Sequence, residues 1–283
     1  MIERRIFHAM GTEIELLVAA EAAEAALAAA EREFHRLEAL LSRFRADSEL
    51  SRLNRDRSLD AGSDLLRVVA LSLAARERTG GRFDPTVHDA VVAAGYDRSF
   101  EDVPDESDEP AAEAATTGGG VRIEGSRVEL APGVRIDLGG IGKGYAAERA
   151  AELLATAGPC LVNAGGDVAT RGGTWPVGVE TGGGRLTLEL AGGGMATSGR
   201  DRRRWRRGGR DLHHLIDPRT GRPADTDLLR VTVVAGDAVA AEVTAKALFL
   251  AGADAAADEA DSAGTPAVLV TDDGRTVYAG GLA

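Results

Sequence analysis

The sequence predicts a protein of the α+β class, with mixed or antiparallel sheets flanked by helices. Strand-like segments follow one another directly and are only interrupted by helices, instead of alternating with them as in a repeating βαβ fold. Alternating runs around tight turns at 121–130 and 267–281 predict two hairpins, and hairpins require antiparallel pairing. The 283 residues suffice for one large domain or two small ones. We predict one domain over residues 1–283.

The first third of the chain predicts one strand and two helices. Residues 12–20 alternate as in a strand, and residues 21–44 place apolar side chains at helical spacings of three and four. A second helix is predicted from Ser63, as the capping residue, to about residue 79, where "GGRFDPT" breaks it. Residues 101–118 form an acidic linker or excursion, because residues 101–113 hold seven acids and no bases.

The rest of the chain predicts a sheet with three helices. After the hairpin at 121–130, a strand ending in "VRIDLGG" leads into a helix over 143–157. "PCLVNAGGDVAT" is a buried strand that enters a glycine turn, and the segments "WPVGVE", "RLTLEL", "GGMATSG" and "LRVTVVA" are further strands. Helices are predicted over 240–252 and 254–263, followed by the terminal hairpin with its turn at Asp273-Gly274.

Composition excludes several classes of function. With 33 basic and 45 acidic residues the formal charge is −12, which disfavours nucleic acid and anionic membranes as partners. The single cysteine, Cys160, cannot form an intrachain disulfide. The N-terminal segment resembles no signal peptide and no run of 18 apolar residues occurs, so we expect no membrane insertion and a cytoplasmic location.

Glycine-rich corners follow two of the predicted strands. "DLGGIGKGYAAERA" matches neither a P-loop nor GxGxxG, because Asp137 stands where the P-loop needs glycine and Tyr145 where the dinucleotide motif does. Tight packing and anion binding at the helix start explain it about equally well. "VNAGGD" is by itself better explained as a structural turn in which Asp167 bonds the backbone.

Four further segments leave more than one interpretation open. "RFDPT" and "HHLIDPRTG" are loop starts or ligand contacts; of the histidines, one is expected to be exposed and idle, and the other is a candidate acid or base. Residues 200–210 hold seven arginines, which favours a solvated hairpin over an anion-binding loop by about two to one. In the helix at 240–252, Glu242 and Lys246 form either a surface ion pair or part of a site.

The order of these motifs resembles that of the FAD:protein FMN transferase family, also called the ApbE or thiamine-biosynthesis lipoprotein family. The resemblance covers nearly the whole chain, from "MGTEIEL" and "LSRFRADSELSRLN" through "GRFDPTV" and "AGYDRSF" to "IDLGGIGKGYAAERA", "LVNAGGDV", "ATSG", "HHLIDPRTGRP" and the helix at 240–252. It implies an ApbE-type flavin-binding domain that uses Mg²⁺ to split the diphosphate of FAD. FMN is moved to a threonine of an acceptor flavoprotein and AMP is released; some members instead hydrolyse FAD.

The resemblance also implies roles for individual residues. His214 would assist the transfer, and Gly140 and Glu242 would hold the metal. The implied FAD contacts are Met10, Phe44 (where many members have Tyr), Arg82, Phe83, Asp84, Asp137, Lys143 and Ile216.

The helix at 240–252 departs from the family pattern in two positions. Glu242 stands where members have the metal-binding Asp, and Lys246 stands where they have the metal-binding Thr. Glutamate remains a hard oxygen ligand, whereas a protonated lysine has no acceptor atom. Three alternatives follow: Mg²⁺ bound by Glu242 with activity intact, a metal-free site in which Lys246 replaces the cation, or an FAD-binding protein with weak or no transferase or pyrophosphatase activity.

Overall fold

The structure, a computed structural model, describes residues 1–112 and 118–282. Contacts between residues divide the chain into two compact units, each assembled from separate stretches of sequence. Unit 1 comprises residues 1–38, 141–199 and 226–283, and unit 2 comprises residues 39–140 and 200–225. The predicted boundaries of a single domain stay a prediction, and the units are described one after the other.

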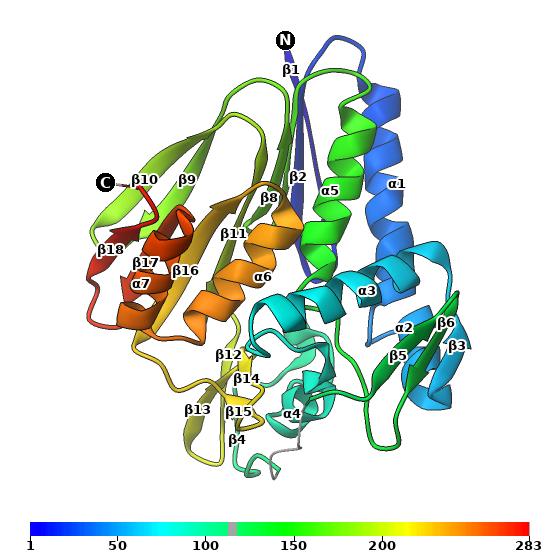
Figure 1. Cartoon of the computed structure of the whole chain (residues 1–283). Coiled ribbons are helices and arrows are strands. Elements are labelled where there is room, and N and C mark those ends of the chain that lie inside the picture. Colours follow the sequence, from blue (N-terminus) through cyan, green and yellow to red (C-terminus); the bar gives the residue numbers. More distant parts are fainter. Residues whose placement is uncertain (113–117, 283) are drawn as a thin grey trace. The chain divides into compact units, whose positions relative to one another are not determined.

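Unit 1 is built on an eight-stranded antiparallel sheet (Figure 1). In spatial order its strands are β1 (Ile2–Ala9), β2 (Thr12–Ala19), β7 (Cys160–Ala164), β8 (Asp167–Arg171), β11 (Gly193–Gly199), β16 (Leu228–Ala235), β17 (Ala267–Thr271) and β18 (Thr276–Ala279). Side chains alternate between the two faces, and most of the central strands are buried on both. Both faces must therefore be covered by other elements.

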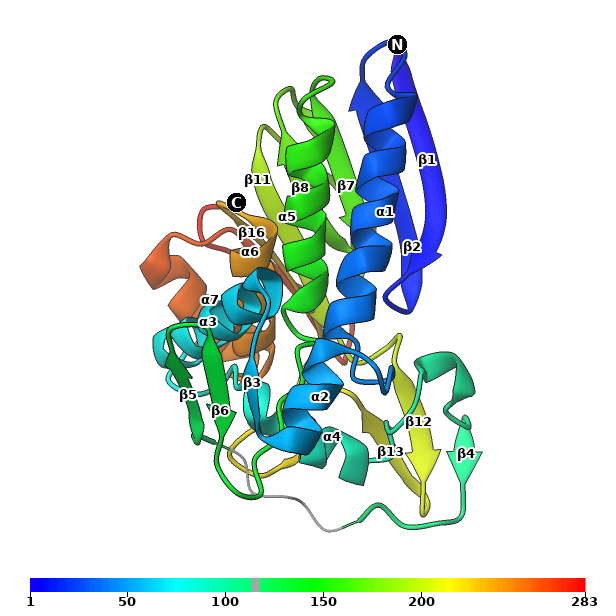
Figure 2. The same ribbon diagram turned by 90° about the vertical axis from the view of Figure 1, so that its right-hand side faces the viewer.

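Helices cover one face of this sheet and a β-hairpin covers the other. Helices α1 (Glu24–Leu41) and α5 (Gly142–Leu154) run side by side along the sheet (Figure 2), and α6 (Ala238–Phe249) packs on β11 and β16. Helix α7 (Ala253–Ala263) packs on β17 and β18. The hairpin of β9 (Trp175–Thr181) and β10 (Gly184–Leu190) covers the opposite face through a cluster of seven buried side chains: Leu161, Val168, Trp175, Val179, Leu190, Met195 and Val268.

Cys160, the lone cysteine, is a core residue of this unit. Its side chain is fully buried, and Sγ lies 3.4 Å from the carbonyl oxygen of Ala151 in α5. Burial raises the pKa of the thiol to about 11. Because the thiolate is the reactive form, Cys160 is inert at neutral pH and carries packing alone.

Unit 2 is assembled from short helices and three small sheets. The helices are α2 (Glu49–Asp56), α3 (Ser63–Arg78), α4 (His88–Ala93) and two 3-10 helices (Pro85–Val87 and Phe100–Asp102). One sheet has the order β3-β6-β5, a second β13-β12-β4 and a third β14-β15. Their strands are β3 (Ser58–Asp60), β4 (Glu106–Ser107), β5 (Val121–Glu124), β6 (Arg127–Leu130), β12 (Arg204–Arg207), β13 (Arg210–His213), β14 (Ile216–Asp217) and β15 (Arg222–Pro223). The β12–β4 pair is parallel, so the sheets of the chain are mixed.

The predicted fold class, α+β with mixed and antiparallel sheets, is confirmed. Most of the predicted helices and hairpins are present, but two local predictions are wrong. Ser63 is the first helical residue of α3, and Gly62 before it is the N-cap, without a side-chain hydrogen bond. The predicted strand around Ile136 is irregular backbone, because the side-chain amide of Asn54 takes the place of a neighbouring strand. Its Oδ1 accepts from Ile136 N and its Nδ2 donates to Ile136 O, both at 2.8 Å.

Candidate functional site

Unit 1 joins three predicted site segments through one buried cluster of charged side chains. Lys143 lies in the first turn of α5, Asp167 is the first residue of β8, and Glu242 lies in the middle of α6. Lys143 Nζ donates to Glu242 Oε1 at 3.1 Å and also to Asp167 Oδ2. Glu242 and Asp167 are only 2 % and 3 % exposed. The cluster therefore holds two acids around one ammonium group, away from bulk water.

Glu242 also satisfies the start of α5. The backbone N–H of Gly144 is one of the groups that a helix leaves without an internal partner, and it donates to Glu242 Oε2 at 2.9 Å. A Cβ atom at position 144 would lie 2.8 Å from the carbonyl oxygen of Ala238. Glycine is thus required there so that α5 can approach α6. Close packing accounts for this glycine, and anion binding at the turn stays a prediction.

The interpretation of Glu242 and Lys246 as a surface ion pair is wrong, because Glu242 is buried. The positive charge of Lys246 also acts on Asp167. Burial raises the pKa of Asp167 to about 6; the charge of Lys143 opposes this rise, the charge of Glu242 adds to it, and the charge of Lys246 opposes it. Lys143, Asp167, Glu242 and Lys246 are therefore one electrostatic unit with two charges of each sign.

The interpretation of Asp167 as a turn residue that bonds the backbone is also wrong. In the turn between β7 and β8 that role belongs to Asn163, whose Oδ1 accepts from Gly166 N at 2.9 Å. Gly165 and Gly166 both have positive φ, which leaves Asp167 at the start of β8, pointing to Lys143. Asp167 is thus a site residue that the sequence argument underrated. The sequence feature that could have indicated its role is the position of this acid directly after two glycines.

Met10 is the other predicted flavin contact in unit 1. It lies in the turn between β1 and β2 with a φ of 53°, a left-handed conformation that is uncommon for residues other than glycine. Its backbone N–H donates to Glu38 Oε1 at 2.7 Å. An acid of α1 therefore fixes this strained turn, and the Met10 side chain is half-buried.

In unit 2, the segment "RFDPT" is anchored by its own side chains. Asp84 caps the 3-10 helix Pro85–Val87 through Thr86 N at 2.8 Å, and it pairs with Arg76 Nε at 2.7 Å. Phe83 is buried and Arg82 is half-buried. The side chains of Phe83 and Asp84 are therefore held in place within unit 2.

Asp137 is held by three interactions within unit 2. Its N–H donates to the carbonyl oxygen of Pro85 at 2.7 Å, its Oδ1 accepts from Gly139 N at 2.6 Å, and its Oδ2 pairs with Arg43 Nε at 2.7 Å. The carboxylate thus fixes the turn that ends at Gly140, the last residue of the first stretch of this unit. Phe44, next to Arg43, is 38 % exposed.

The two adjacent histidines have different environments, and the expectation that one is exposed and idle is wrong. His213 is buried: its Nε2 donates to Ala224 O at 3.0 Å, and its Nδ1 accepts from Leu215 N at 3.3 Å. His214 is half-buried, and its Nδ1 lies 3.4 Å from the carbonyl oxygen of Arg203. A proton on Nδ1 would donate to that carbonyl and leave Nε2 as the basic atom. His213 is therefore a structural residue, and His214 keeps its candidate role.

His213 predicts a pH dependence of stability. Burial lowers its pKa to about 4, so the imidazole is neutral when folded and gains a proton on unfolding below pH 6.5. Its stabilisation is fully present above pH 6.5 and is lost as the pH falls through 4, a loss of about 3 kcal/mol. When the free energy of unfolding is measured in urea, it should fall less between pH 7 and 4 for His213→Gln than for the unaltered chain. The Asp167 carboxyl changes stability with pH in the opposite direction, but both proteins contain it and its effect cancels in the comparison. Equal losses of the free energy of unfolding in the two proteins would contradict the assignment of His213.

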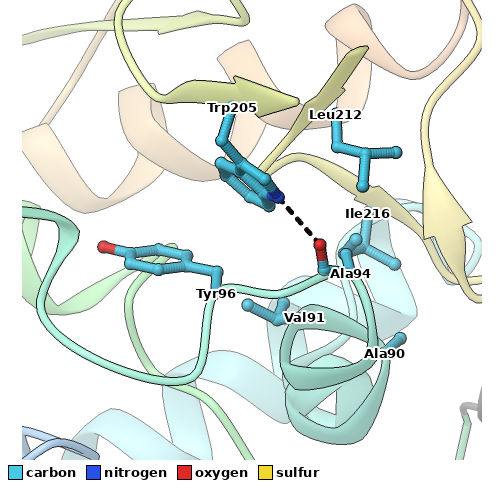
Figure 3. Packing of buried hydrophobic residues seen from close by; sticks show 7 residues of the cluster. All are labelled: Ala90, Val91, Ala94, Tyr96, Trp205, Leu212 and Ile216. Carbon is cyan, nitrogen blue, oxygen red and sulfur yellow. Dashed lines mark hydrogen bonds between the residues drawn. The ribbon is translucent and has the colours of Figure 1, made fainter. Parts of the chain in front are cut away.

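Ile216, another predicted flavin contact, is 6 % exposed and belongs to an apolar cluster in unit 2 (Figure 3). Trp205 lies at its centre, and its Nε1 donates to the carbonyl oxygen of Ala94 at 2.8 Å. Tyr96 packs on Trp205 with ring centroids 5.8 Å apart. Ile216 therefore contributes packing to this cluster.

The arginine-rich segment forms the hairpin β12–β13, as predicted, but it is only partly solvated. Trp205 is buried, and β4 from the acidic segment pairs with β12. Arg207 Nη2 donates to Glu109 Oε2 at 2.8 Å, and Arg206 Nε lies 3.9 Å from Glu106. Part of the acidic segment thus neutralises these arginines, while its residues 113–117 lie outside the described residues.

The metal-ligand atoms that unit 1 offers fit a magnesium site that a bound diphosphate completes. Among the described residues, no group of three His, Cys, Asp or Glu side chains is arranged to hold a metal ion. Glu242 supplies one buried carboxylate, and Lys246 supplies no acceptor. Mg²⁺ usually binds one or two carboxylates together with water and substrate phosphates, so Glu242 suits a site that a diphosphate completes.

Comparisons with known proteins agree with the motif order. Residues 10–269 match the model of the ApbE family. The chain is 29% identical over 259 residues to the FAD:protein FMN transferase of Salmonella typhimurium, covering 83% of this chain and 74% of the relative. It is 30% identical over 259 residues to that of Vibrio cholerae, covering 84% of this chain and 78% of the relative.

Solved structures show the same fold. The ApbE protein of Thermotoga maritima superposes with a TM-score of 0.88 at 26% identity, over 99% of this chain and 97% of that one. The flavin transferase ApbE from Vibrio cholerae superposes with a TM-score of 0.80 at 23% identity, over 99% and 97%, which is a likeness of fold alone. With a family model that spans most of its length and relatives of this similarity, the chain belongs to the ApbE family.

Proposed function

We propose that this chain is an FAD:protein FMN transferase that moves FMN from FAD to a threonine of an acceptor flavoprotein and releases AMP. Membership of the ApbE family and relatives with this name support the activity. The observation that carries the proposal is the buried cluster of Lys143, Asp167 and Glu242, which sets an ammonium group and a carboxylate beside the start of α5. Helix starts and ammonium groups stabilise anionic oxygens such as those of a diphosphate.

The chain's own residues would divide the work in the following way. Lys143 would turn from its carboxylates toward the diphosphate, where its charge offsets the charge that develops on the phosphate oxygens. His214 would exchange a proton at Nε2 with the threonine hydroxyl or the leaving group. The remaining residues that are flavin contacts by resemblance would position FAD: Met10, Phe44, Arg82, Phe83, Asp84, Asp137 and Ile216.

Glu242 would hold Mg²⁺, and by resemblance the carbonyl of Gly140 would be a further ligand. When bound, the ion neutralises phosphate charge and orients the diphosphate. With Glu242 as its single carboxylate, we expect binding to Mg²⁺ to be weak without FAD and stronger with it.

A second candidate function is flavin binding without transfer. One observation favours it: the charge of Lys246 acts on Asp167 together with that of Lys143, so a second ammonium group belongs to the cluster and would offset diphosphate charge in place of a divalent ion. A single-charged ammonium group provides less stabilisation of a transition state than Mg²⁺ does, and such a chain would hold FAD and release little AMP.

The acceptor reaction gives the most specific test of the proposal. Purified chain, FAD and Mg²⁺ are incubated with an acceptor flavoprotein, and with the same acceptor whose target threonine is changed to valine. Covalent flavin on the threonine protein, with equimolar AMP and none on the valine protein, is the expected result. AMP with free FMN and no acceptor labelling would indicate FAD hydrolysis instead.

The remaining expectations concern partners and location. None of the described helices combines the length and apolarity needed to cross a membrane. The identity of the acceptor and a cytoplasmic location stay proposals, and cell fractionation with an antibody against the chain tests the second.

A further inference from the structure

Arg43 joins the segments of unit 2 that carry predicted flavin contacts, although the resemblance, which includes its segment "LSRFRADSELSRLN", implies no role for it. Its side chain is 7 % exposed, which is rare for a residue of this type. A guanidinium group removed from water is costly unless each partner is well placed. The partners of Arg43 therefore indicate what its burial achieves.

Two of the partners are polar. Arg43 Nε pairs with Asp137 Oδ2 at 2.7 Å, and Nη2 donates to the carbonyl oxygen of Tyr96 at 2.7 Å. The other oxygen of Asp137 accepts from Gly139 N. Arg43 thus fixes both the rotamer of Asp137 and the turn that follows it. A carboxylate held in this way presents only acceptor lone pairs to a ligand.

The other two partners are aromatic. Arg43 Cζ lies 4.1 Å from the ring centroid of Phe44 and 4.6 Å from that of Tyr96, and the two rings are 5.6 Å apart. Tyr96 is buried against Trp205 and Phe100, whereas Phe44 is exposed. The guanidinium group therefore holds an exposed ring in place through cation–π contacts to both aromatic side chains.

We propose that Arg43 is a positioning residue for flavin binding: it holds the Asp137 carboxylate and the Phe44 ring in one fixed arrangement that receives the ligand. This inference rests on the proposed function, because Asp137 and Phe44 are flavin contacts by resemblance. Lysine cannot replace Arg43 fully, since an ammonium group has no planar fork to bond Asp137 and Tyr96 while facing two rings.

The test compares Arg43→Met and Arg43→Lys with Arg55→Met, a matched control in α2 whose side chain is 60 % exposed and pairs with Asp56. FAD affinity is measured by quenching of flavin fluorescence, and KM and kcat by AMP release. We expect Arg43→Met to raise the Kd and KM for FAD about tenfold or more and to change kcat by less than about threefold. The Kd and KM of Arg43→Lys should lie between those of Arg43→Met and the unaltered chain. The control should have the same values as the unaltered chain.

A double-mutant cycle separates positioning from folding. If Arg43 acts through Phe44, Phe44→Leu should weaken FAD binding much less in the Arg43→Met background than in the unaltered chain. Full additivity, or FAD affinity of both Arg43 variants within twofold of the unaltered chain, would overturn the inference. Arg43→Lys keeps the charge and answers the question if the Met variant does not fold. Failure of the proposed transfer itself would differ, because the unaltered chain would then release no AMP whether or not it binds FAD, whereas failure of the positioning role would leave the FAD affinity of the Arg43 variants unchanged.

Discussion

Glu242→Gln is expected to release AMP from FAD about 100-fold more slowly than the unaltered chain, or slower still. The amide oxygen can still accept from Gly144 N, so the start of α5 keeps its partner. The negative charge is lost, and with it the ion pair to Lys143 and the carboxylate proposed for Mg²⁺. The rate of AMP formation at saturating FAD and Mg²⁺ measures the effect.

Glu242→Asp is the control for this variant, because it keeps the charge on a side chain one methylene shorter. It should retain most of the activity, whereas Glu242→Gln should not, although both should have the same circular dichroism. A Glu242→Gln protein that kept more than a tenth of the rate would show that charge at this position does not matter for the chemistry.

His214→Gln should have the second large effect, a decrease of about 100-fold to 10,000-fold in kcat. Glutamine resembles imidazole in size and can still bond the carbonyl oxygen of Arg203, but it cannot exchange a proton near neutral pH. The KM for FAD should change little, because the contribution is made in the transfer step. Steady-state AMP release separates the two parameters.

His35→Gln serves as the control for His214→Gln. His35 lies in α1 with its side chain 51% exposed, outside every predicted contact. Its replacement should leave kcat unchanged. If His214→Gln turned over at the rate of this control, the catalytic assignment of His214 would be wrong and the proton would have to leave by another group.

The elements that the sequence predicts well are those in which apolar residues recur at a regular spacing. Helices α1, α5 and α6 and the hairpin β5–β6 follow from apolar spacing and turn residues alone. Strand β1 was missed because it is the edge strand of its sheet: charged and apolar residues do not alternate along it, and Ile2 and Ile6 remain exposed. The segment at Ile136 has the pattern of a strand, but Asn54, 82 positions earlier, provides its hydrogen bonds.

The candidate site was predictable as a set of residues and not as a set of contacts. The motifs indicate Lys143 and Glu242, but their contact spans 99 positions and no spacing rule connects them. The burial of Asp167 and His213, and hence their shifted pKa values, also depends on elements far apart in the chain. Arg43 lies in the segment "LSRFRADSELSRLN" that carries part of the resemblance, but nothing in the sequence indicates its burial or its pairing with Asp137.

The central claim is tested most directly by incubating the purified chain with FAD, with Mg²⁺ and with EDTA. AMP and FMN are followed by chromatography, and Mg²⁺ binding is followed by calorimetry in the presence of FAD. The account predicts AMP release that stops with EDTA and returns when Mg²⁺ is added in excess. Tight FAD binding without heat from Mg²⁺ and without AMP would contradict it and would show that this chain binds flavin without transferring it.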